Sequence, residues 1–275
     1  MNRAARQPQR GFTLIELIMV IVIMGVIGGM VSVFMKGPID AYLDSARRAA
    51  LTDVADTVAR RMARDIQKAL PNSISPTTNG PCVEFIPTKT GGRYRSTDGD
   101  GSLTTGATSF TMLGSNTTFA GTPLSADQQI AQGDVIVVGN TGQTGADAYS
   151  GGNTMVVGAP PFSVTGAPNI ETTFPISAIP ALTVYNSSRF QVVQGNERVV
   201  SYVCNSSGEL RRTVNATDFT HSCLATGPLL ARGATCTFVF DQQSARDALI
   251  RINLQLTENG ETVSLWNEVH IGTSP

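Results

Sequence analysis

Residues 10–35 read RGFTLIELIMVIVIMGVIGGMVSVFM, and this stretch decides how the chain is organised. The run from Phe12 to Met35 is 24 residues long, and Glu16 is its only charged residue. A helix of about 20 apolar residues is long enough to cross the hydrocarbon core of a membrane. Residues 1–10 contain three arginines and no acid, so the positive-inside rule keeps this leader in the cytoplasm. The sequence therefore predicts one membrane-spanning helix, with the rest of the chain outside the cytoplasm.

Two simpler interpretations leave part of this pattern unexplained. A cleaved secretory signal has an apolar stretch of roughly 7 to 15 residues followed by small residues at the cleavage site, and this run is longer and lacks such a site. An uncleaved anchor explains the length and the arginines. However, an acid within a spanning helix costs roughly 2.5 to 3.5 kcal/mol. The attraction of Glu16 to its own helix dipole returns only about 0.3 to 1 kcal/mol. A plain anchor therefore does not account for Glu16.

The string GFTLIE, at residues 11–16, closely resembles the class III signal of type IV prepilins and pseudopilins. The resemblance implies that a prepilin peptidase cuts between Gly11 and Phe12 and that Phe12 becomes N-methylphenylalanine. The leader, residues 1–11, is then discarded, and the apolar helix, residues 12–36, remains. The resemblance also implies that Glu16 meets the charged amine of a neighbouring subunit in a filament. Opposite charges attract strongly in such a low-dielectric setting, whereas either charge alone is costly there.

Composition argues against several other classes of function. Only 15% of the 275 residues are charged and the formal net charge is −1, so no basic cluster points to a nucleic-acid partner. The chain contains no G-x-x-x-x-G-K-[ST], no G-x-S-x-G and no H-E-x-x-H. We therefore expect neither an enzyme nor a cofactor.

The four cysteines indicate disulfides rather than a metal site. They are Cys82, Cys204, Cys223 and Cys236. They contain no C-x-x-C pair, which disfavours zinc, and an extracytoplasmic location permits disulfides. Three full pairings are possible, and the sequence does not choose among them.

The segment STDGDGS, residues 96–102, offers a weak calcium candidate in Asp98 and Asp100. Counted from Asp98, an EF-hand loop requires Gly at position 103 and Glu at position 109. The chain has Leu103 and Ser109 instead. A solvated turn is therefore the preferred interpretation.

Residues 37–70 are expected to continue the helix with a different character. Pro38 removes a helix hydrogen bond, so we expect a kink there. An amphipathic pattern follows and ends before Pro71. Its apolar positions are Leu51, Val54, Val58, Met62, Ile66 and Leu70, widened by Ala55, Ala59 and Ala63. The expected i, i+4 ion pairs are Asp44–Arg48, Asp56–Arg60 and Arg61–Asp65. Acids and bases are balanced here, which favours packing on the following domain over a membrane surface.

Residues 71–275 are expected to form a β-rich extracytoplasmic head. Predicted strands cover residues 83–86, 109–113, 134–138, 154–157, 189–194, 198–204, 236–240, 248–256 and 262–271, whereas residues 87–180 are expected to be rich in loops. Asn259-Gly260 predicts a type I′ hairpin between the last two strands. The expected pairs are Leu256 with Val263, Leu254 with Leu265, and Ile250 with Val269. Trp266 would project from the opposite face.

Together these features predict an α+β, pilin-like fold: a long kinked N-terminal helix packed on an antiparallel β-rich head. Three segments of the head, CVEFIPTKTGGRYRSTDGDGSL (82–103), SYVC (201–204) and TCTFVFD (235–241), are similar to the MshO group. These are minor pilin-like biogenesis proteins of the mannose-sensitive haemagglutinin (MSHA) pilus.

The resemblance implies a minor pilin that helps to initiate or cap a type IV pilus. Its partners would be other pilins and minor pilins through the N-terminal helix, the prepilin peptidase and the inner-membrane assembly platform. The protein would first span the inner membrane once, with a periplasmic head, and then reach a pilus or pseudopilus at the cell surface. A pseudopilin of a type II secretion system and a pilus-tip adhesin are the alternatives.

Overall fold

The computed structural model describes residues 11–75, 80–95, 103–166, 170–181, 188–221, 223–242 and 247–272. Within these residues the chain is α+β, with one long helix and antiparallel strands. It divides into two compact units, residues 1–50 and 51–275. We describe each unit by itself.

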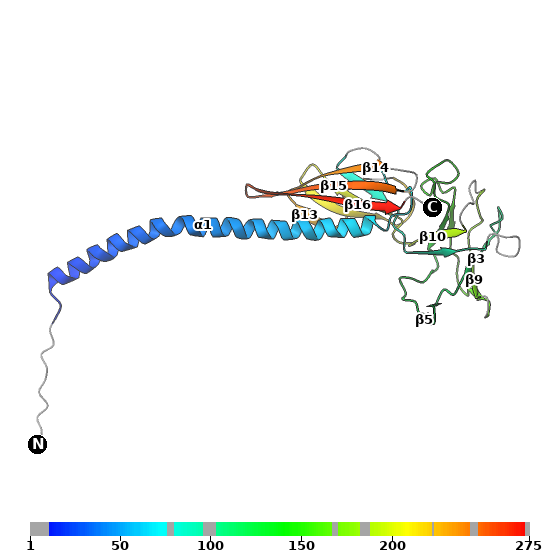
Figure 1. Cartoon of the computed structure of the whole chain (residues 1–275), viewed down its shortest axis with the longest axis horizontal. Helices are drawn as coiled ribbons and strands as arrows, with labels where there is room; N and C mark the ends of the chain where they lie inside the picture. The colour runs from blue at the N-terminus through cyan, green and yellow to red at the C-terminus, as the bar shows by residue number, and fades with distance from the viewer. Residues whose placement is uncertain are drawn as a thin grey trace, which may run out of the picture. The chain divides into compact units, whose positions relative to one another are not determined.

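The long helix α1 spans Leu14–Ile66 and begins in the first unit. Every described residue of that unit is exposed. By length and composition, α1 can cross a membrane. It continues through Pro38 without interruption, and Figure 1 shows a gradual curve along its blue half. A kink at Pro38 therefore stays a prediction.

In the second unit, α1 contributes an apolar stripe to the main core. The buried residues of the helix are Leu51, Ala55, Val58, Ala59, Met62 and Ile66. Val54 was expected in this stripe but is 43% exposed. At 3.6 residues per turn, Val54 lies about 90° from the centre of the stripe, so it faces away from the core.

The helix ends at Ile66, four residues before the predicted end. The chain then pairs with a strand instead of continuing the helix: Ala69 bridges Pro87, and the Leu70 N–H donates to the Ile86 carbonyl at 2.7 Å. Pairing with Ile86 and Pro87 therefore replaces the last turn of the helix that the sequence pattern predicted.

Two sheets cover the stripe of α1. One has the order β1-β11-β12-β13 and the other the order β14-β15-β16. Their strands are β1 (Cys82–Phe85), β11 (Val199–Cys204), β12 (Glu209–Asn215), β13 (Leu229–Arg232), β14 (Ala234–Gln242), β15 (Asp247–Glu258) and β16 (Glu261–Gly272). Figure 1 shows the cyan end of α1 lying along β14, β15 and β16. One continuous hydrophobic cluster joins the helix to both sheets, which confirms the predicted packing on the head.

The β15–β16 hairpin has the predicted register. The structure pairs Leu256 with Val263, Leu254 with Leu265, and Ile250 with Val269. Asn259 and Gly260 have φ values of 50° and 85°, and a type I′ turn requires positive φ at both positions. Trp266 lies on the face opposite the core and is 72% exposed.

A second β-body is inserted between β1 and β11. These two strands are antiparallel neighbours, with Phe85 opposite Val200, so the chain leaves and re-enters the main core at one place. The inserted body has sheets of order β2-β10-β6-β7 and β3-β9-β8 and a small β4–β5 pair. Its strands are β2 (Thr90–Arg93), β3 (Ser109–Leu113), β4 (Thr118–Phe119), β5 (Thr122–Pro123), β6 (Val135–Val138), β7 (Thr154–Val156), β8 (Ser163–Val164), β9 (Glu171–Pro175) and β10 (Arg189–Val193).

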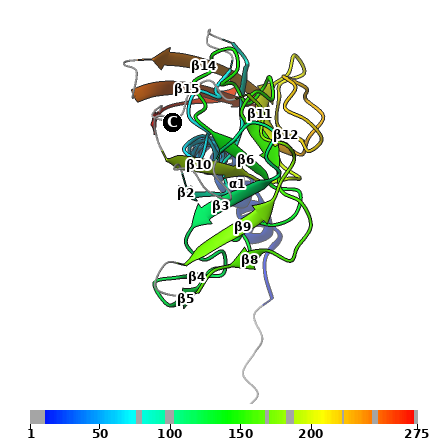
Figure 2. The same cartoon turned by 90° about the vertical axis from the view of Figure 1, so that its right-hand side faces the viewer.

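The inserted body has its own hydrophobic core, built around Phe110, Phe174 and Phe190. Figure 2 shows β3, β9 and β8 grouped away from β14 and β15. Residues 87–180 were expected to be rich in loops, and the strands there are short, but five of them (β2, β4, β5, β8 and β9) were not predicted. The unrecognised strands are short and rich in Thr and Gly, and their partners lie far away in sequence.

Two disulfides fix the cysteine pairing that the sequence left open. Cys82 pairs with Cys223 and Cys204 pairs with Cys236, with Cα atoms 6.0 and 5.8 Å apart. The second bridge ties β11 to β14 and therefore joins the two sheets that cover α1.

Candidate processing and assembly site

The start of α1 brings together the predicted processing residues. Gly11, Phe12 and Thr13 precede the helix, and Leu14 is its first residue. Phe12 is 84% exposed. The bond between Gly11 and Phe12 thus lies outside helical backbone, in a segment that an enzyme can reach.

Thr13 caps the helix, a role that our sequence analysis missed. The Glu16 N–H donates to Thr13 Oγ1 at 3.3 Å, and the Leu17 N–H donates to the Thr13 carbonyl at 3.2 Å. Thr13 and Glu16 have the Thr-x-x-Glu spacing of a capping box. That spacing, directly before an apolar run, was a readable signal.

Glu16 is a carboxylate within an exposed apolar surface. The large apolar side chains from Phe12 to Met35 are 47% to 84% exposed. Among the described residues, no cation forms an ion pair with Glu16. An apolar surface of this extent requires lipid or other helices around it. In either environment an ionised carboxylate is costly unless it is paired or hydrogen-bonded.

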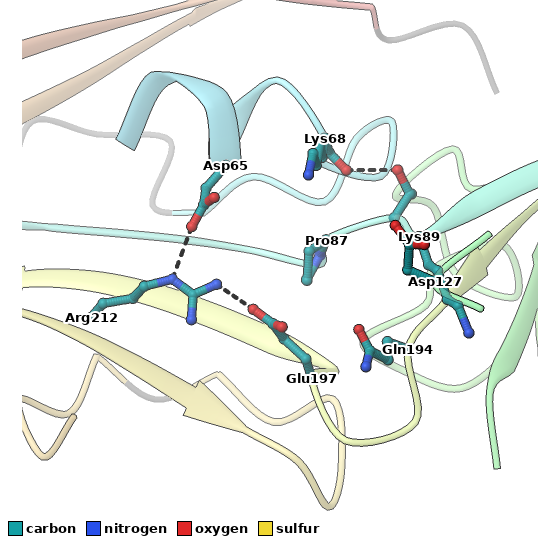
Figure 3. Close-up of a pocket in the computed structure, with 9 residues that line it drawn as sticks. Asp65, Lys68, Pro87, Lys89, Asp127, Gln194, Glu197 and Arg212 are labelled. Atoms are coloured by element: carbon teal, nitrogen blue, oxygen red, sulfur yellow. Dashed lines mark hydrogen bonds and ion pairs between the residues drawn. The ribbon is translucent and has the colours of Figure 1, made fainter. Parts of the chain in front are cut away.

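Asp65, near the other end of α1, has its partners within the chain (Figure 3). Arg212 Nε donates to Asp65 Oδ2 at 2.9 Å, and the Tyr202 hydroxyl donates to the same oxygen at 2.7 Å. Arg212 also forms an ion pair with Glu197. The sequence had paired Asp65 with Arg61, since a partner 147 positions away leaves no local pattern.

This network shifts the pKa values of its members. Burial raises the pKa of Tyr202 far above its usual value, and the hydrogen bond to Asp65 adds to the effect. Burial lowers the pKa of Arg212, but the hydrogen bonds that Arg212 donates to Glu197 and Asp65 outweigh burial and leave the pKa above its ordinary range.

A polar cavity of about 200 Å³ lies beside the network. Lys68, Lys89 and Asp127 also line it (Figure 3). Lys89 is already paired with Asp134 at 2.9 Å. Among these charges, Asp65, Arg212 and Glu197 join the end of α1 to the head, whereas Lys89 pairs with a residue of the inserted body.

A buried acid, Glu84, connects three separate segments. It is 2% exposed and lies 2.6 Å from Nδ1 of His221. The His221 ring stacks on Tyr149 at a centroid distance of 3.8 Å, and the Tyr149 hydroxyl donates to the Ser73 carbonyl. Burial raises the pKa of Tyr149, and the charges of Glu84 and Asp147 raise it further. This cluster reinforces the region beside the Cys82–Cys223 bridge.

The remaining candidate residues are placed as follows. Asp98 and Asp100 lie outside the described residues. Within the part of the chain that the structure describes, no group of three or more His, Cys, Asp or Glu residues is arranged to hold a metal ion.

The comparison with protein families agrees with the geometry at the start of α1. The prokaryotic N-terminal methylation motif matches residues 6–32, which include the last part of the leader, Gly11, Phe12 and Glu16. No characterised protein and no solved structure has a significant match to the chain. The chain therefore carries a prepilin-type N-terminus, and the match does not extend to the head.

Proposed function

We propose that this protein is a minor pilin-like subunit of a type IV filament of the MSHA type. The observation that carries the proposal is the methylation motif at residues 6–32, joined to an apolar helix whose Glu16 has no positive partner among the described residues. A prepilin peptidase would cut between Gly11 and Phe12 and methylate the new N-terminus.

The cleavage itself supplies a partner for Glu16. It creates a positive amine on Phe12, only four residues from Glu16 in the sequence. Within one helix the amine lies at the helix terminus, whereas a neighbouring subunit shifted along the filament can place its amine beside this Glu16. The pair would then favour one register of assembly, because a shift in either direction leaves two buried charges unpaired.

The head supports a low-copy role. A repeating filament packs identical subunits closely, and the inserted body between β1 and β11 adds bulk that each copy would have to accommodate. A subunit at the end of the filament has fewer neighbours. We therefore assign this protein to the initiation or capping of the filament, and the resemblance of three head segments to the MshO group supports the MSHA system.

The proposal implies a sequence of partners and locations. The subunit first spans the inner membrane with its head in the periplasm, and there it meets the prepilin peptidase and the inner-membrane assembly platform. It then contacts other pilins through α1 in the pilus. Both disulfides fit an extracytoplasmic head.

Substitution of Glu16 tests the proposal. We expect Glu16→Ala to be cut and methylated at Phe12 like the wild type, but to be depleted from sheared filaments, because the amine of the neighbour loses its partner. Mass spectrometry of the mature N-terminus and of the filaments measures both steps. Asp53→Ala is the matched control, since Asp53 is an exposed α1 carboxylate outside the apolar run.

Normal incorporation of Glu16→Ala would contradict the assembly role of Glu16. An uncut wild-type chain would contradict the proposal as a whole. A deletion strain then identifies the system. Loss of pili indicates the proposed role, loss of protein secretion indicates a type II pseudopilin, and normal pili with lost attachment indicate a tip adhesin.

A further inference from the structure

The strand β16 is a long edge strand with one free side. It lies at the edge of the sheet β14-β15-β16, and all twelve of its residues pair with β15 in unbroken register. Among the described residues, no strand pairs with its other side. Strands in globular proteins are most often about 5 to 6 residues long. The free edge is therefore unusually extended.

Apart from the charged Glu261 and Glu268, the features that normally protect such an edge are missing from β16. Proteins block free edges with Pro, Lys, bulges or very short strands. The sequence of β16, ETVSLWNEVHIG, has no Pro, Lys or Arg, and its pairing with β15 has no bulge. The edge is thus open to the addition of another strand.

The hairpin turn determines which backbone groups are free. In a two-residue hairpin, the residues flanking the turn exchange both hydrogen bonds, and the pattern then alternates along the strands. Glu258 and Glu261 flank the turn. Consequently, the N–H groups of Ser264, Trp266 and Glu268 point toward the free edge.

Apolar side chains on both faces of β16 are incompletely covered. On the inner face, Val269 and Ile271 are 1% and 4% exposed, whereas Val263 and Leu265 are only half-buried. On the outer face, Trp266 is 72% exposed. A strand added beside β16 would cover side chains on both faces at once.

The β16 strand of a second copy does not fit the edge. Figure 1 shows that β16 runs in the same direction as the cyan part of α1. Two antiparallel β16 strands related by a two-fold axis would therefore point their α1 helices in opposite directions, although both helices must enter one membrane from the same side. Two β16 strands could pair in parallel only about a two-fold axis that runs along the strands. Such an axis turns one sheet over, so the inner face of one sheet would lie next to the outer face of the other.

We infer that the free edge of β16 binds a β-strand of a different pilin-like subunit. This inference rests on the proposed function. The partner strand carries apolar side chains over Val263 and Leu265, which are half-buried. Glu268 already has a partner, since Arg251 Nε lies 3.3 Å from its Oε1. Backbone hydrogen bonds provide affinity in such strand addition, and the alternating side chains provide specificity.

Photo-crosslinking in cells tests the inference on the full-length protein. A p-benzoylphenylalanine residue at position 264 should form an adduct with one other processed pilin-like subunit, which mass spectrometry identifies. Position 235 is the control, because Thr235 lies on the exposed face of β14 in the same cross-strand row as Ser264, two strands from β16. An adduct at position 264 and none at position 235 supports the inference.

The Ser264→Pro variant tests the same edge without a probe. Its missing N–H would point to the free side, so the β15–β16 ladder stays intact and the Tm should remain close to that of the wild type. We expect several-fold less of this variant in sheared filaments, with unchanged methylation of Phe12.

Three outcomes would overturn the inference: no adduct at position 264, equal adducts at positions 264 and 235, or an adduct with a second copy or an unrelated protein. Wild-type incorporation of Ser264→Pro would overturn it as well. An unmethylated wild-type Phe12 would instead overturn the proposed function, so the two failures are distinguishable.

Discussion

The α1 carboxylates of Asp65 and Glu16 lie in opposite surroundings. Asp65 lies in the head and receives hydrogen bonds from Arg212 and Tyr202 of its own chain. Glu16 lies among exposed apolar side chains, and its carboxylate forms no ion pair with the described residues. The first carboxylate therefore stabilises the fold, whereas the second is suited to assembly with another molecule.

At the residue scale, we predict that Tyr202→Phe destabilises the head. The loss of one hydrogen bond to a charged acceptor should lower the free energy of unfolding by about 1 to 2 kcal/mol at pH 7. Burial raises the pKa of Tyr202 in the folded state, so the unfolded chain loses this proton first as the pH rises. The contribution of Tyr202 is thus complete below about pH 10, the unperturbed value, and declines at higher pH.

Urea unfolding of the full-length protein in detergent, from pH 7 to pH 11, measures this effect. The difference between the wild type and Tyr202→Phe should narrow above pH 10. Tyr42→Phe is the control, because Tyr42 is 73% exposed, and it should follow the wild type. A difference that stays constant with pH would show that the Tyr202 hydroxyl is not held as described.

At the scale of elements, the register of the β15–β16 hairpin is set by its turn as well as by the apolar residues that face the core. Asn259 and Gly260 both have positive φ, which matches the right-handed twist of the strands. The same turn sets the alternation that leaves Ser264, Trp266 and Glu268 with outward N–H groups. A local dipeptide thus determines both the buried face of the sheet and its free edge.

We predict that Gly260→Ala lowers the free energy of unfolding by about 1 kcal/mol, because an L-residue is strained at positive φ. A Cβ at Gly260 would meet no atom within 4 Å, so the cost is backbone strain without a steric clash. Gly272→Ala is the matched control, since its Cβ also meets open space and its φ is not positive. Thermal unfolding of both variants measures the difference, and equal Tm values would exclude the type I′ turn.

An element could be predicted from the sequence where residues close to it in the chain determine its structure. The helix, the register of β15 and β16, and the roles expected for Gly11, Phe12 and Glu16 follow from short patterns. The strand β2 was missed because Thr90–Arg93 contains two glycines. A Cβ at Gly91 would lie 2.8 Å from the Phe190 carbonyl oxygen, so the close approach of β10 selects glycine there. The Asp65–Arg212 pair was missed for the same reason: its cause is a distant segment.

At the scale of the head, the Cys204–Cys236 bridge joins the two sheets that pack on α1. We predict that the double variant Cys204→Ala/Cys236→Ala loses about 2 to 4 kcal/mol of stability, a typical value for removing a disulfide. Chemical unfolding of the oxidised proteins measures this loss. Peptide mapping without reduction should show Cys82 still joined to Cys223 in the variant, and Cys82 joined to Cys204 or Cys236 in the wild type would contradict the structure.

The insertion between β1 and β11 has a consequence for how proteins of this architecture diversify. Phe85 and Val200 are cross-strand neighbours, so the chain leaves for the inserted body and returns from it at one place. A small hydrophobic cluster, with Leu70 and Ile86 on one side and Val135 and Val137 on the other, packs the inserted body against the rest of the head. Exchange of that body for another with closely spaced ends would leave Met62 and Ile66 of α1 in their packing site. Apart from the residues of that shared cluster, the packing site of α1 and the inserted body can therefore vary independently. Two such proteins could share the long helix and its packing site while having no recognisable similarity in their inserted bodies.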